Sequence, residues 1–319
     1  MARGRQIVKK LEVEEITLKV AAEDFYSHNA VKGLSVAAQK AYKNYVDCFM
    51  RWCGEDTVVA DISGRTIEEY LLVKREAGNK PVSLATTAKH LRRFIYFCAS
   101  RNYLIKFEVT IPKFEVELKE PYTDEEMKLL LAKPKSNSWI ELRAWAMVNY
   151  FFSTGQRLST VLNIKVCHLD FINSRVKLEW NKDKRQKYMP LSTALVRVLR
   201  EYIDVSDLAE EDYLFPEYEG GQLKVRSAED AIADYNKRRG VEKTSIHLFR
   251  HTFAKNYIMN GGNPVKLQKL LNHKTMDMTM RYINLYGDDI SADLDLFNPL
   301  DNFKRSNYTP TKRRKLAAI

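Results

Sequence analysis

The sequence predicts a mainly α-helical protein with a small β-sheet, an α+β fold divided between two domains. Apolar residues recur at helical spacing through most of the 319 residues, whereas residues 175–191 alternate like a pair of strands. A third observation is the segment 107–121, which favours extended structure, has no helical face and contains two prolines. A chain of this length is sufficient for two domains with separate cores, so we expect this segment to connect them.

The first half of the chain has the pattern of a helical domain, which we place at residues 21–113 after an N-terminal arm, residues 1–20. Ser35 is expected to cap one helix and Ser83 another, because a serine hydroxyl accepts a hydrogen bond from the first turn of a helix. A shorter helix is predicted over residues 66–76. The apolar face of the Ser83 helix consists of Leu91, Phe94, Ile95 and Cys98.

The opposite face of the Ser83 helix carries polar and basic side chains at i, i+3, i+4 and i+7: Thr86, Lys89, His90 and Arg93. One interpretation is a solvated surface. The other is a DNA-contacting surface, because a basic helical face with threonine is typical of helices that enter the major groove. The helix by itself does not decide between them.

The second domain is placed at residues 122–300, between a linker at residues 114–121 and a basic tail at residues 301–319. Its first helix is predicted from Thr123 and Glu126, which have the spacing of a capping box.

The interior of this domain is predicted to be mixed. A strongly apolar helix over residues 139–152 is expected at the centre of its core. Residues 175–180 and 186–191 are expected to form a β-hairpin, and helical patterns dominate after it.

The composition indicates a globular protein with a polyanionic partner. The sequence has 52 Lys and Arg against 41 Asp and Glu, a formal net charge of +11 and a pI near 9.3. A basic excess favours binding to nucleic acid, since neutralised phosphates release counterions. No apolar run reaches the length of a membrane span, and the N-terminus lacks the apolar core of a signal peptide. We therefore expect a cytoplasmic, nucleoid-associated protein without a membrane partner.

The four cysteines are expected to be reduced thiols, because none of them forms a CxxC pair. The neighbouring Cys167 and His168 have no second pair of ligands at suitable spacing. We predict no metal site and no cofactor.

Four local patterns follow one another along the second domain. The first is TGQRLS at 154–159, where the glycine would end the apolar helix and present Arg157 at a turn. The second is the charged hairpin turn NKDKRQK at 181–187. The third is HLFRHTFA at 247–254, whose His247 and Arg250 share a helical face and can bind one anion together. The fourth is LLNH at 270–273, followed nine residues after His273 (282 − 273) by Tyr282.

Together these patterns resemble the tyrosine recombinase (phage integrase) superfamily, particularly its compact Xer-like members. TGQRLS fits the family pattern T-G-x-R-x-S, and HLFRHTFA fits H-x-x-R-H-T-F/S-A at all eight positions. LLNH and Tyr282 fit L-L-G-H followed nine residues later by tyrosine, with Asn272 in place of the usual glycine. YLFP at 213–216 resembles a further landmark. The resemblance covers residues 21–299 and is specific in the second domain, while in the first only the helical pattern agrees.

The resemblance implies an enzyme that cleaves and rejoins DNA through a 3′-phosphotyrosine, without a metal or ATP. The chemistry of the residues agrees with this expectation. A tyrosine phenol titrates near pH 10 and needs neighbouring cations to become a nucleophile, and arginine gives planar, bidentate contacts to phosphate oxygens. Histidine side chains can add hydrogen bonds and transfer protons. The catalytic residues that it implies are Tyr282, Arg157, Arg250, His247, His273 and Lys182.

Three positions leave alternatives open. Lys182 holds the family's hairpin-lysine position and is our choice for the general acid on the leaving 5′ oxygen, with Lys184 as the alternative. Tyr286, one turn after Tyr282, is the rival nucleophile. Thr160 stands where the family usually has Glu or Asp, which puts a contact that orients neighbouring groups in doubt.

The other histidines, His28, His90, His168 and His251, are interpreted as structural or surface residues. Of these, His251 is the closest case, because it lies inside the HLFRHTFA pattern. We expect it to pack against the helix that follows.

The resemblance also implies a core-binding first domain and a catalytic second domain that together clamp duplex DNA. The candidate DNA contacts of the first domain are Lys40, Lys43, Thr86, Lys89 and Arg93. Recombination between inverted-repeat core sites implies a homotetramer on paired DNA sites, with a monomer or dimer when free. Two other functions stay open: a type IB topoisomerase, which relaxes DNA without exchanging partners, and a non-catalytic, sequence-specific DNA-binding protein.

Overall fold

The computed structural model describes residues 15–114, 120–136, 138–178, 187–273 and 275–286. The chain forms two compact units, residues 1–118 and residues 119–319, and each is described by itself. The predicted α+β class, mainly helical with a small sheet, is confirmed.

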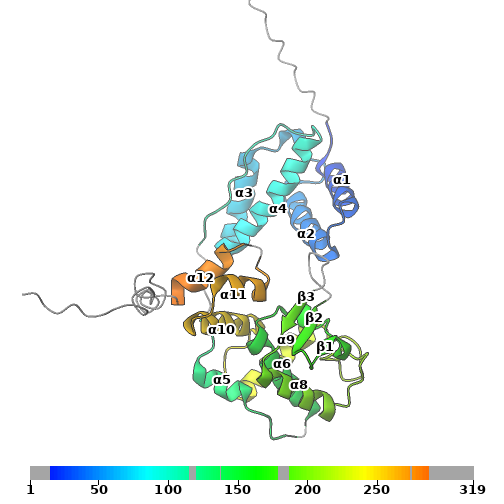
Figure 1. Cartoon of the computed structure of the whole chain (residues 1–319). Coiled ribbons are helices and arrows are strands. Elements are labelled where there is room, and N and C mark those ends of the chain that lie inside the picture. Colours follow the sequence, from blue (N-terminus) through cyan, green and yellow to red (C-terminus); the bar gives the residue numbers. More distant parts are fainter. Residues whose placement is uncertain (1–14, 115–119, 137, 179–186, 274, 287–319) are drawn as a thin grey trace, which may run out of the picture. The chain divides into compact units, whose positions relative to one another are not determined.

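The first unit is helical, coloured blue to cyan in Figure 1. Its helices are α1 (Leu18–Val31), α2 (Val36–Cys53), the 3-10 helix η1 (Val59–Asp61), α3 (Gly64–Glu76) and α4 (Pro81–Ser100). The expected apolar face of α4 is buried, and the ring of Phe94 packs on that of Phe25 from α1 at a centroid distance of 5.4 Å. The other three residues of that face, Leu91, Ile95 and Cys98, are fully buried as well.

Three expected helix starts in this unit differ from the structure. The helix predicted over residues 66–76 begins at Gly64, because the Ser63 side chain accepts a hydrogen bond from the amide of Thr66. The helix α1 begins at Leu18, inside the segment predicted as an arm, because the Thr17 side chain accepts a hydrogen bond from the amide of Val20. Ser83 does not cap α4. Pro81 occupies the first turn, where its fixed φ suits a helix and its missing N–H costs nothing, so α4 starts three residues before the position that a Ser83 cap would give. Ser35 caps α2 as predicted, through the amide of Ala38.

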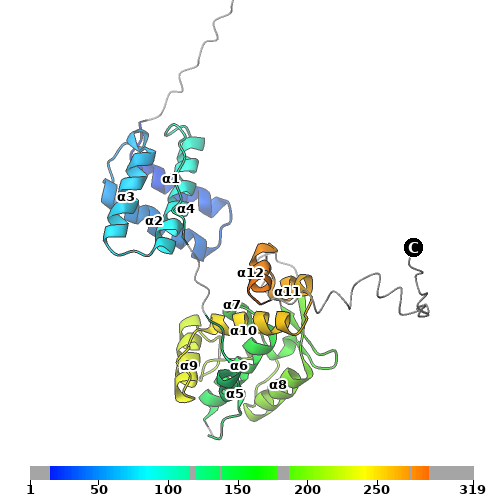
Figure 2. The ribbon, with the colours of Figure 1, turned by 90° about the vertical axis from the view of Figure 1, so that its left-hand side faces the viewer.

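The second unit combines helices, which Figure 2 labels, with a small sheet whose strands lie at one side of the unit in Figure 1. Its helices are α5 (Asp124–Leu131), α6 (Trp139–Thr154), α7 (Leu158–Val161), η2 (Val166–His168), α8 (Thr193–Val205), α9 (Val225–Arg238), α10 (Ile246–Met259), α11 (Pro264–Leu271) and α12 (Asp277–Tyr286). The predicted capping box of α5 is present, because the Thr123 hydroxyl and the Glu126 carboxylate each accept from the other residue's amide.

The sheet is antiparallel in the order β1 (Leu169–Asp170), β2 (Arg175–Leu178) and β3 (Lys187–Pro190). The predicted hairpin corresponds to β2 and β3, with Val176 opposite Met189. The two-residue strand β1 was not predicted, because it is too short for an alternating pattern.

The helix α6 is the centre of the second unit, as its apolar sequence predicts. Its Tyr150 and Phe151 are almost fully buried, and Phe151 stacks on Phe249 of α10. In turn α10 packs against both α6 and α12. The core thus fixes α10 relative to the end of α6. The turn that follows α6 is therefore held in place beside α10.

Among the helices that the structure describes, none has the length and apolar character needed to traverse a bilayer.

Candidate active site

The turn after α6 places the first arginine. Gly155 ends the helix in the left-handed region, with φ +60°, and a Cβ atom there would lie 2.6 Å from Cδ1 of Phe253 and 2.7 Å from Cδ2 of Leu271. Only glycine fits both the conformation and the space. The chain therefore turns sharply, and Arg157 begins the short helix α7 two residues later.

The second arginine comes from α10 and is held by the same turn. Arg250 is 7% exposed and donates from Nη1 to the carbonyl of Gly155 and from Nη2 to the carbonyl of Leu271, both at 2.7 Å. Arg157 is half-buried and donates from Nη1 to the carbonyl of Asn272 at 3.4 Å. Two backbone segments, the end of α6 and the end of α11, thus orient both guanidinium groups.

The positive charge of this pair is not neutralised by the described residues. Within the described residues, both guanidinium groups donate to backbone carbonyls rather than to carboxylates. Burial, followed by the charge of Arg157, lowers the pKa of Arg250 to about 10, while nearby Tyr282 acts in the opposite direction. Arg250 therefore remains protonated at neutral pH. Burying an uncompensated charge is costly, so such a pair favours an anionic ligand.

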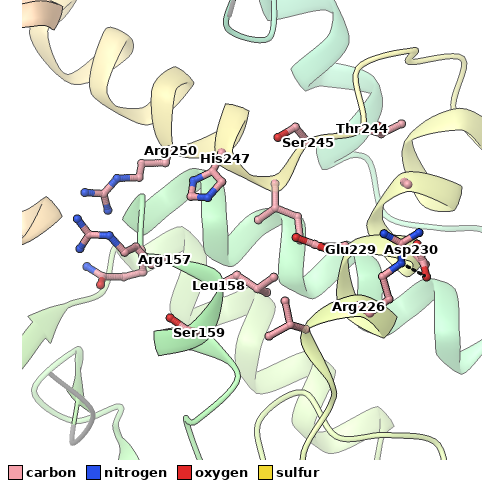
Figure 3. A pocket seen from close by; sticks show the side chains of 14 residues that line it. Arg157, Leu158, Ser159, Arg226, Glu229, Asp230, Thr244, Ser245, His247 and Arg250 are labelled. Atoms are coloured by element: carbon pink, nitrogen blue, oxygen red, sulfur yellow. Dashed lines mark hydrogen bonds and ion pairs between the residues drawn. The ribbon is translucent and has the colours of Figure 1, made fainter. Parts of the chain in front are cut away.

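A pocket of about 440 Å³ opens beside the two arginines (Figure 3). Arg157, Arg250 and the imidazole of His247 lie together at one end of it, with Arg226, Glu229 and Asp230 at the other. His247 is exposed and lies one helical turn before Arg250 on α10. The structure thus brings TGQRLS and HLFRHTFA, which are about 90 residues apart, to one pocket.

His273 follows the end of α11. The helix ends at Asn272, which has a left-handed conformation with φ 51° and ψ 52°. Asparagine tolerates this region better than other residues with a Cβ, which explains how it replaces the family's usual glycine. The His273 side chain is 7% exposed, and its Nδ1 lies 2.8 Å from the hydroxyl oxygen of Thr279.

Burial, reinforced by the charges of the site, favours the neutral form of His273. Burial, then Arg250, Arg157 and His251, lower the pKa of His273 to about 4. Among the described residues, no carboxylate contributes to this shift. Thr160, where the family usually has an acidic residue, is half-buried and donates its amide to the carbonyl of Arg157 at 2.9 Å.

Tyr282 lies on α12, between two histidines. It is 6% exposed, and its hydroxyl oxygen is 2.9 Å from Nδ1 of His251 on α10. The ring of His273 is nearly parallel to that of Tyr282, at an angle of 4° and a centroid distance of 6.4 Å. The tyrosine is thus held by its ring and by its hydroxyl.

His251 is the residue that the sequence interpretation missed. We expected it to pack against the following helix, but its ring nitrogen contacts the Tyr282 hydroxyl. Its place in HLFRHTFA, one helical turn after His247, was the available signal. Two other histidines have contacts away from this site: the His90 ring of α4 stacks on Tyr45 of α2, and Nδ1 of His168 accepts from the amide of Lys165.

Some predicted positions lie outside the described residues. Lys182 and Lys184 belong to this group, as does the tail at residues 301–319. The backbone of Tyr286 belongs to α12, but its side chain is not described. Within the described ranges, no group of three or more His, Cys, Asp or Glu side chains is arranged to hold a metal ion.

The candidate DNA contacts of the first unit lie on α2 and α4. Lys40, Lys89 and Arg93 are exposed. Lys43 is exposed too, but forms an ion pair with Asp47 at 3.2 Å. The Thr86 hydroxyl donates to the carbonyl of Val82 at 2.8 Å. Lys40 and Arg93 are thus the side chains best placed for an external phosphate, while the Lys89 ammonium group lies 5.5 Å from the centroid of the Phe114 ring.

The fold and this arrangement of tyrosine, arginines and histidines define a tyrosine recombinase. Residues 121–288, more than half of the chain, match the phage integrase family, and the chain belongs to that family. A tyrosine recombinase of Pseudothermotoga lettingae is 29% identical over 281 residues, covering 83% of this chain and 93% of the relative. The tyrosine recombinase XerD of Haemophilus ducreyi is 23% identical, covering 92% and 99%.

Solved structures share the fold. A lambda integrase dimer bound to a COC′ core site has a TM-score of 0.69 at 17% identity, covering 84% of this chain and 95% of that one. The Tn1549 transposon integrase in complex with circular intermediate DNA has a TM-score of 0.68 at 15% identity, covering 84% and 94%. A lambda integrase tetramer bound to a Holliday junction has a TM-score of 0.69 at 17% identity, covering 84% and 78%.

Proposed function

We propose that this tyrosine recombinase carries out site-specific exchange of DNA strands, with Tyr282 as its nucleophile. The observation that carries the proposal is the convergence of three charged or reactive groups from distant segments. Arg157 and Arg250 share a pocket end, and Tyr282 is close enough to Arg250 to affect its pKa. A buried and a half-buried guanidinium group, which donate to backbone carbonyls and lie near a tyrosine, suit a phosphodiester.

The arginines bind the scissile phosphate. Each guanidinium group donates to nonbridging oxygens and stabilises the extra negative charge of the pentacovalent transition state, for which the planar fork of arginine is better suited than lysine. Because backbone carbonyls orient Arg250 before DNA arrives, little reorganisation is needed. His247, which faces the same pocket, adds a further donor to the phosphate.

The reaction follows from the direction of attack. The Tyr282 oxygen forms a bond to phosphorus and the bond to the 5′ oxygen breaks, leaving a 3′-phosphotyrosine and a free 5′-hydroxyl. The 5′-hydroxyl of a partner strand then attacks this linkage and releases Tyr282. His273, neutral and parallel to the tyrosine ring, keeps the nucleophile in place.

The leaving 5′ oxygen requires a proton, for which Lys182 is the proposed donor and Lys184 the alternative. A substrate with sulfur in place of that oxygen separates them, because a thiolate leaves without protonation. Lys182→Ala should cleave ordinary DNA slowly and the sulfur-containing DNA at a normal rate, by single-turnover kinetics. If only Lys184→Ala shows this rescue, Lys184 is the acid.

The substrate is duplex DNA with inverted-repeat core sites, and the active assembly is a homotetramer on two paired sites. Recombination joins two duplexes at two strands each, so four nucleophiles are required. The lambda integrase tetramer on a Holliday junction supports this stoichiometry by similarity of fold. We place the protein in the cytoplasm with the nucleoid, where such DNA is found.

The nucleophile is tested by covalent trapping on nicked DNA sites. Tyr282→Phe should abolish the covalent protein–DNA adduct while leaving DNA binding intact. Tyr286→Phe is the matched control and should retain the adduct. Adducts that persist in Tyr282→Phe, or disappear in Tyr286→Phe, would show that the nucleophile is assigned wrongly.

Strand exchange is tested with two differently labelled DNA sites. Products that join the labels support recombination, whereas relaxation of supercoiled DNA without joined products would identify a type IB topoisomerase. Binding without any covalent adduct would identify a non-catalytic DNA-binding protein.

The DNA contacts of the first unit are tested by salt dependence. Lys89→Gln and Arg93→Gln should each reduce the slope of log affinity against log salt by about 1, as expected for one lost phosphate contact. Lys128→Gln, an equally exposed charge change on α5, is the control and should leave the slope unchanged. An equal change in all three variants would refute a specific contact.

A further inference from the structure

Tyr282 and His251 form a pair that the family resemblance did not assign. The tyrosine oxygen is 2.9 Å from Nδ1 of His251, a normal hydrogen-bond distance, and the two ring centroids are 5.8 Å apart at 48°. Both side chains are fixed by packed helices, since α12 rests on α10. The contact is therefore part of the packed core of the second unit.

The other two histidines of the site are placed for different tasks. Nδ1 of His273 is already within 2.8 Å of the Thr279 hydroxyl, and the His273 ring lies parallel to the tyrosine ring. His247 lines the pocket beside Arg157 and Arg250. Of the three, His251 is the one whose ring nitrogen contacts the reacting oxygen.

The helix α10 explains how these roles separate. His247, Arg250 and His251 lie at i, i+3 and i+4, so they share one face of the helix. The first two line the pocket where we place the phosphate, and the third contacts α12. One helix thus presents a phosphate-binding pair and a tyrosine-binding residue side by side.

Resting on the proposed function, we propose that His251 is a catalytic residue that accepts the phenol proton of Tyr282 as the tyrosine attacks. The neutral ring carries its hydrogen on Nε2 and uses the lone pair of Nδ1 as the acceptor. As the bond from the tyrosine oxygen to phosphorus forms, the proton moves to Nδ1. The bond from phosphorus to the 5′ oxygen breaks, and that oxygen takes a proton from the separate general acid. When the 5′-hydroxyl of the partner strand attacks, His251 returns its proton to Tyr282.

This step addresses the main difficulty of the nucleophile. A phenol with a pKa near 10 is about 0.1% ionised at pH 7, so its attack benefits from a base within hydrogen-bond distance. Positioned general bases typically contribute about 10²–10⁴-fold to a rate. Removing His251 is therefore expected to slow cleavage by about 10²-fold or more.

The first test compares substitutions at His251 with a matched histidine elsewhere in the unit. His251→Asn keeps a hydrogen-bond acceptor near the Nδ1 position but cannot take a proton, and His251→Ala keeps neither. Both should slow single-turnover adduct formation by about 10²-fold while DNA affinity changes less than about twofold. His168→Asn should behave like the unsubstituted protein. If His251→Asn cleaves at the normal rate, His251 only positions the hydroxyl and the proposal is overturned.

The second test separates the nucleophile from the leaving group. With a sulfur leaving group in place of the 5′ oxygen, the defect of His251→Asn should persist, because its cause is on the tyrosine side. Rescue by sulfur would make His251 an acid for the leaving group and overturn the proposal. In a second comparison, Tyr282 is replaced with a fluorotyrosine of lower phenol pKa. The cleavage rates of the protein with His251 and of the His251→Asn variant should then differ less than they do with tyrosine. An unchanged difference contradicts proton transfer.

A third measurement needs no substitution at His251 and is therefore independent of folding defects. In the ¹⁵N NMR spectrum of the unsubstituted protein, the neutral His251 ring should carry its hydrogen on Nε2. A hydrogen on Nδ1 would leave no lone pair for the tyrosine and would overturn the proposal. Loss of all adducts in Tyr282→Phe is a separate readout, so failure of the nucleophile assignment is distinguishable from failure of the base assignment.

Discussion

Replacing Gly155 with alanine should damage both the stability and the chemistry of the second unit. The added methyl group would meet Cδ1 of Phe253 at 2.6 Å and Cδ2 of Leu271 at 2.7 Å, closer than real Cβ contacts. The backbone there has φ +60°, which alanine disfavours. The neighbouring carbonyl also orients Arg250, so any shift of this turn moves the guanidinium group.

The magnitude has two parts. A left-handed conformation costs a residue with a Cβ about 1–2 kcal/mol. Forcing a methyl group into filled space costs typically about 1–3 kcal/mol. Gly155→Ala should therefore lower the free energy of unfolding by about 2–5 kcal/mol. Gly240→Ala is the matched control, since Gly240 has φ +74° but nothing within 4 Å of its Cβ position. Gly240→Ala should therefore lower the free energy of unfolding only by the conformational cost of about 1–2 kcal/mol.

The assay is urea unfolding followed by tryptophan fluorescence in a Trp52→Phe background. Trp52 is the tryptophan of the first unit, so its removal leaves the signal to the second unit. The stability difference between the Gly155 and Gly240 variants measures the steric part alone. If the two variants are equally stable, the close approach around Gly155 is not what requires glycine there, and the reasoning is wrong.

Three further outcomes follow from the site. Arg250→Lys should reduce the single-turnover cleavage rate by about 10²–10³-fold while DNA affinity is retained. The reason is that a lysine ammonium group cannot contact two carbonyls and a phosphate together. An unchanged cleavage rate would contradict this reasoning. By urea unfolding, Asn272→Gly should be neutral and Asn272→Ala should lose about 1 kcal/mol, since φ is 51° at this position; equal values would refute the conformational argument. The pKa of His273 is lowered to about 4 in the folded state, from an ordinary 6.5. The unfolded chain therefore binds more protons between these values, and the His273 contribution to stability should be lost as pH falls from 6.5 to about 4. Thermal unfolding of His273→Asn should lack this part of the pH dependence, and an identical profile would refute it.

Local structure was largely predictable because its causes are local. The capping box of Thr123 and Glu126, the Ser35 cap and the apolar helix α6 all depend on residues within a few positions of one another. The start of α4 was predicted wrongly because two local signals competed, and Pro81 in the first turn prevailed over Ser83.

The candidate site was predictable residue by residue but not as an arrangement. The resemblance carried by the four motifs implied Arg157, Arg250, His247, His273 and Tyr282. The motifs do not indicate that the carbonyls of Gly155 and Leu271 both accept hydrogen bonds from the guanidinium group of Arg250. Those bonds join segments that are distant in the chain.

His251 marks the boundary between the two kinds of information. The sequence by itself determined that this histidine lies on α10, one turn after His247 and next to Arg250. Helical periodicity gives the face on which a side chain lies but not the element that packs against that face. Only the tertiary structure, by placing α12 on α10, decided that Nδ1 of His251 meets the hydroxyl of Tyr282. The reason is that the packing of buried apolar surfaces, rather than any local preference, determines which helices are neighbours.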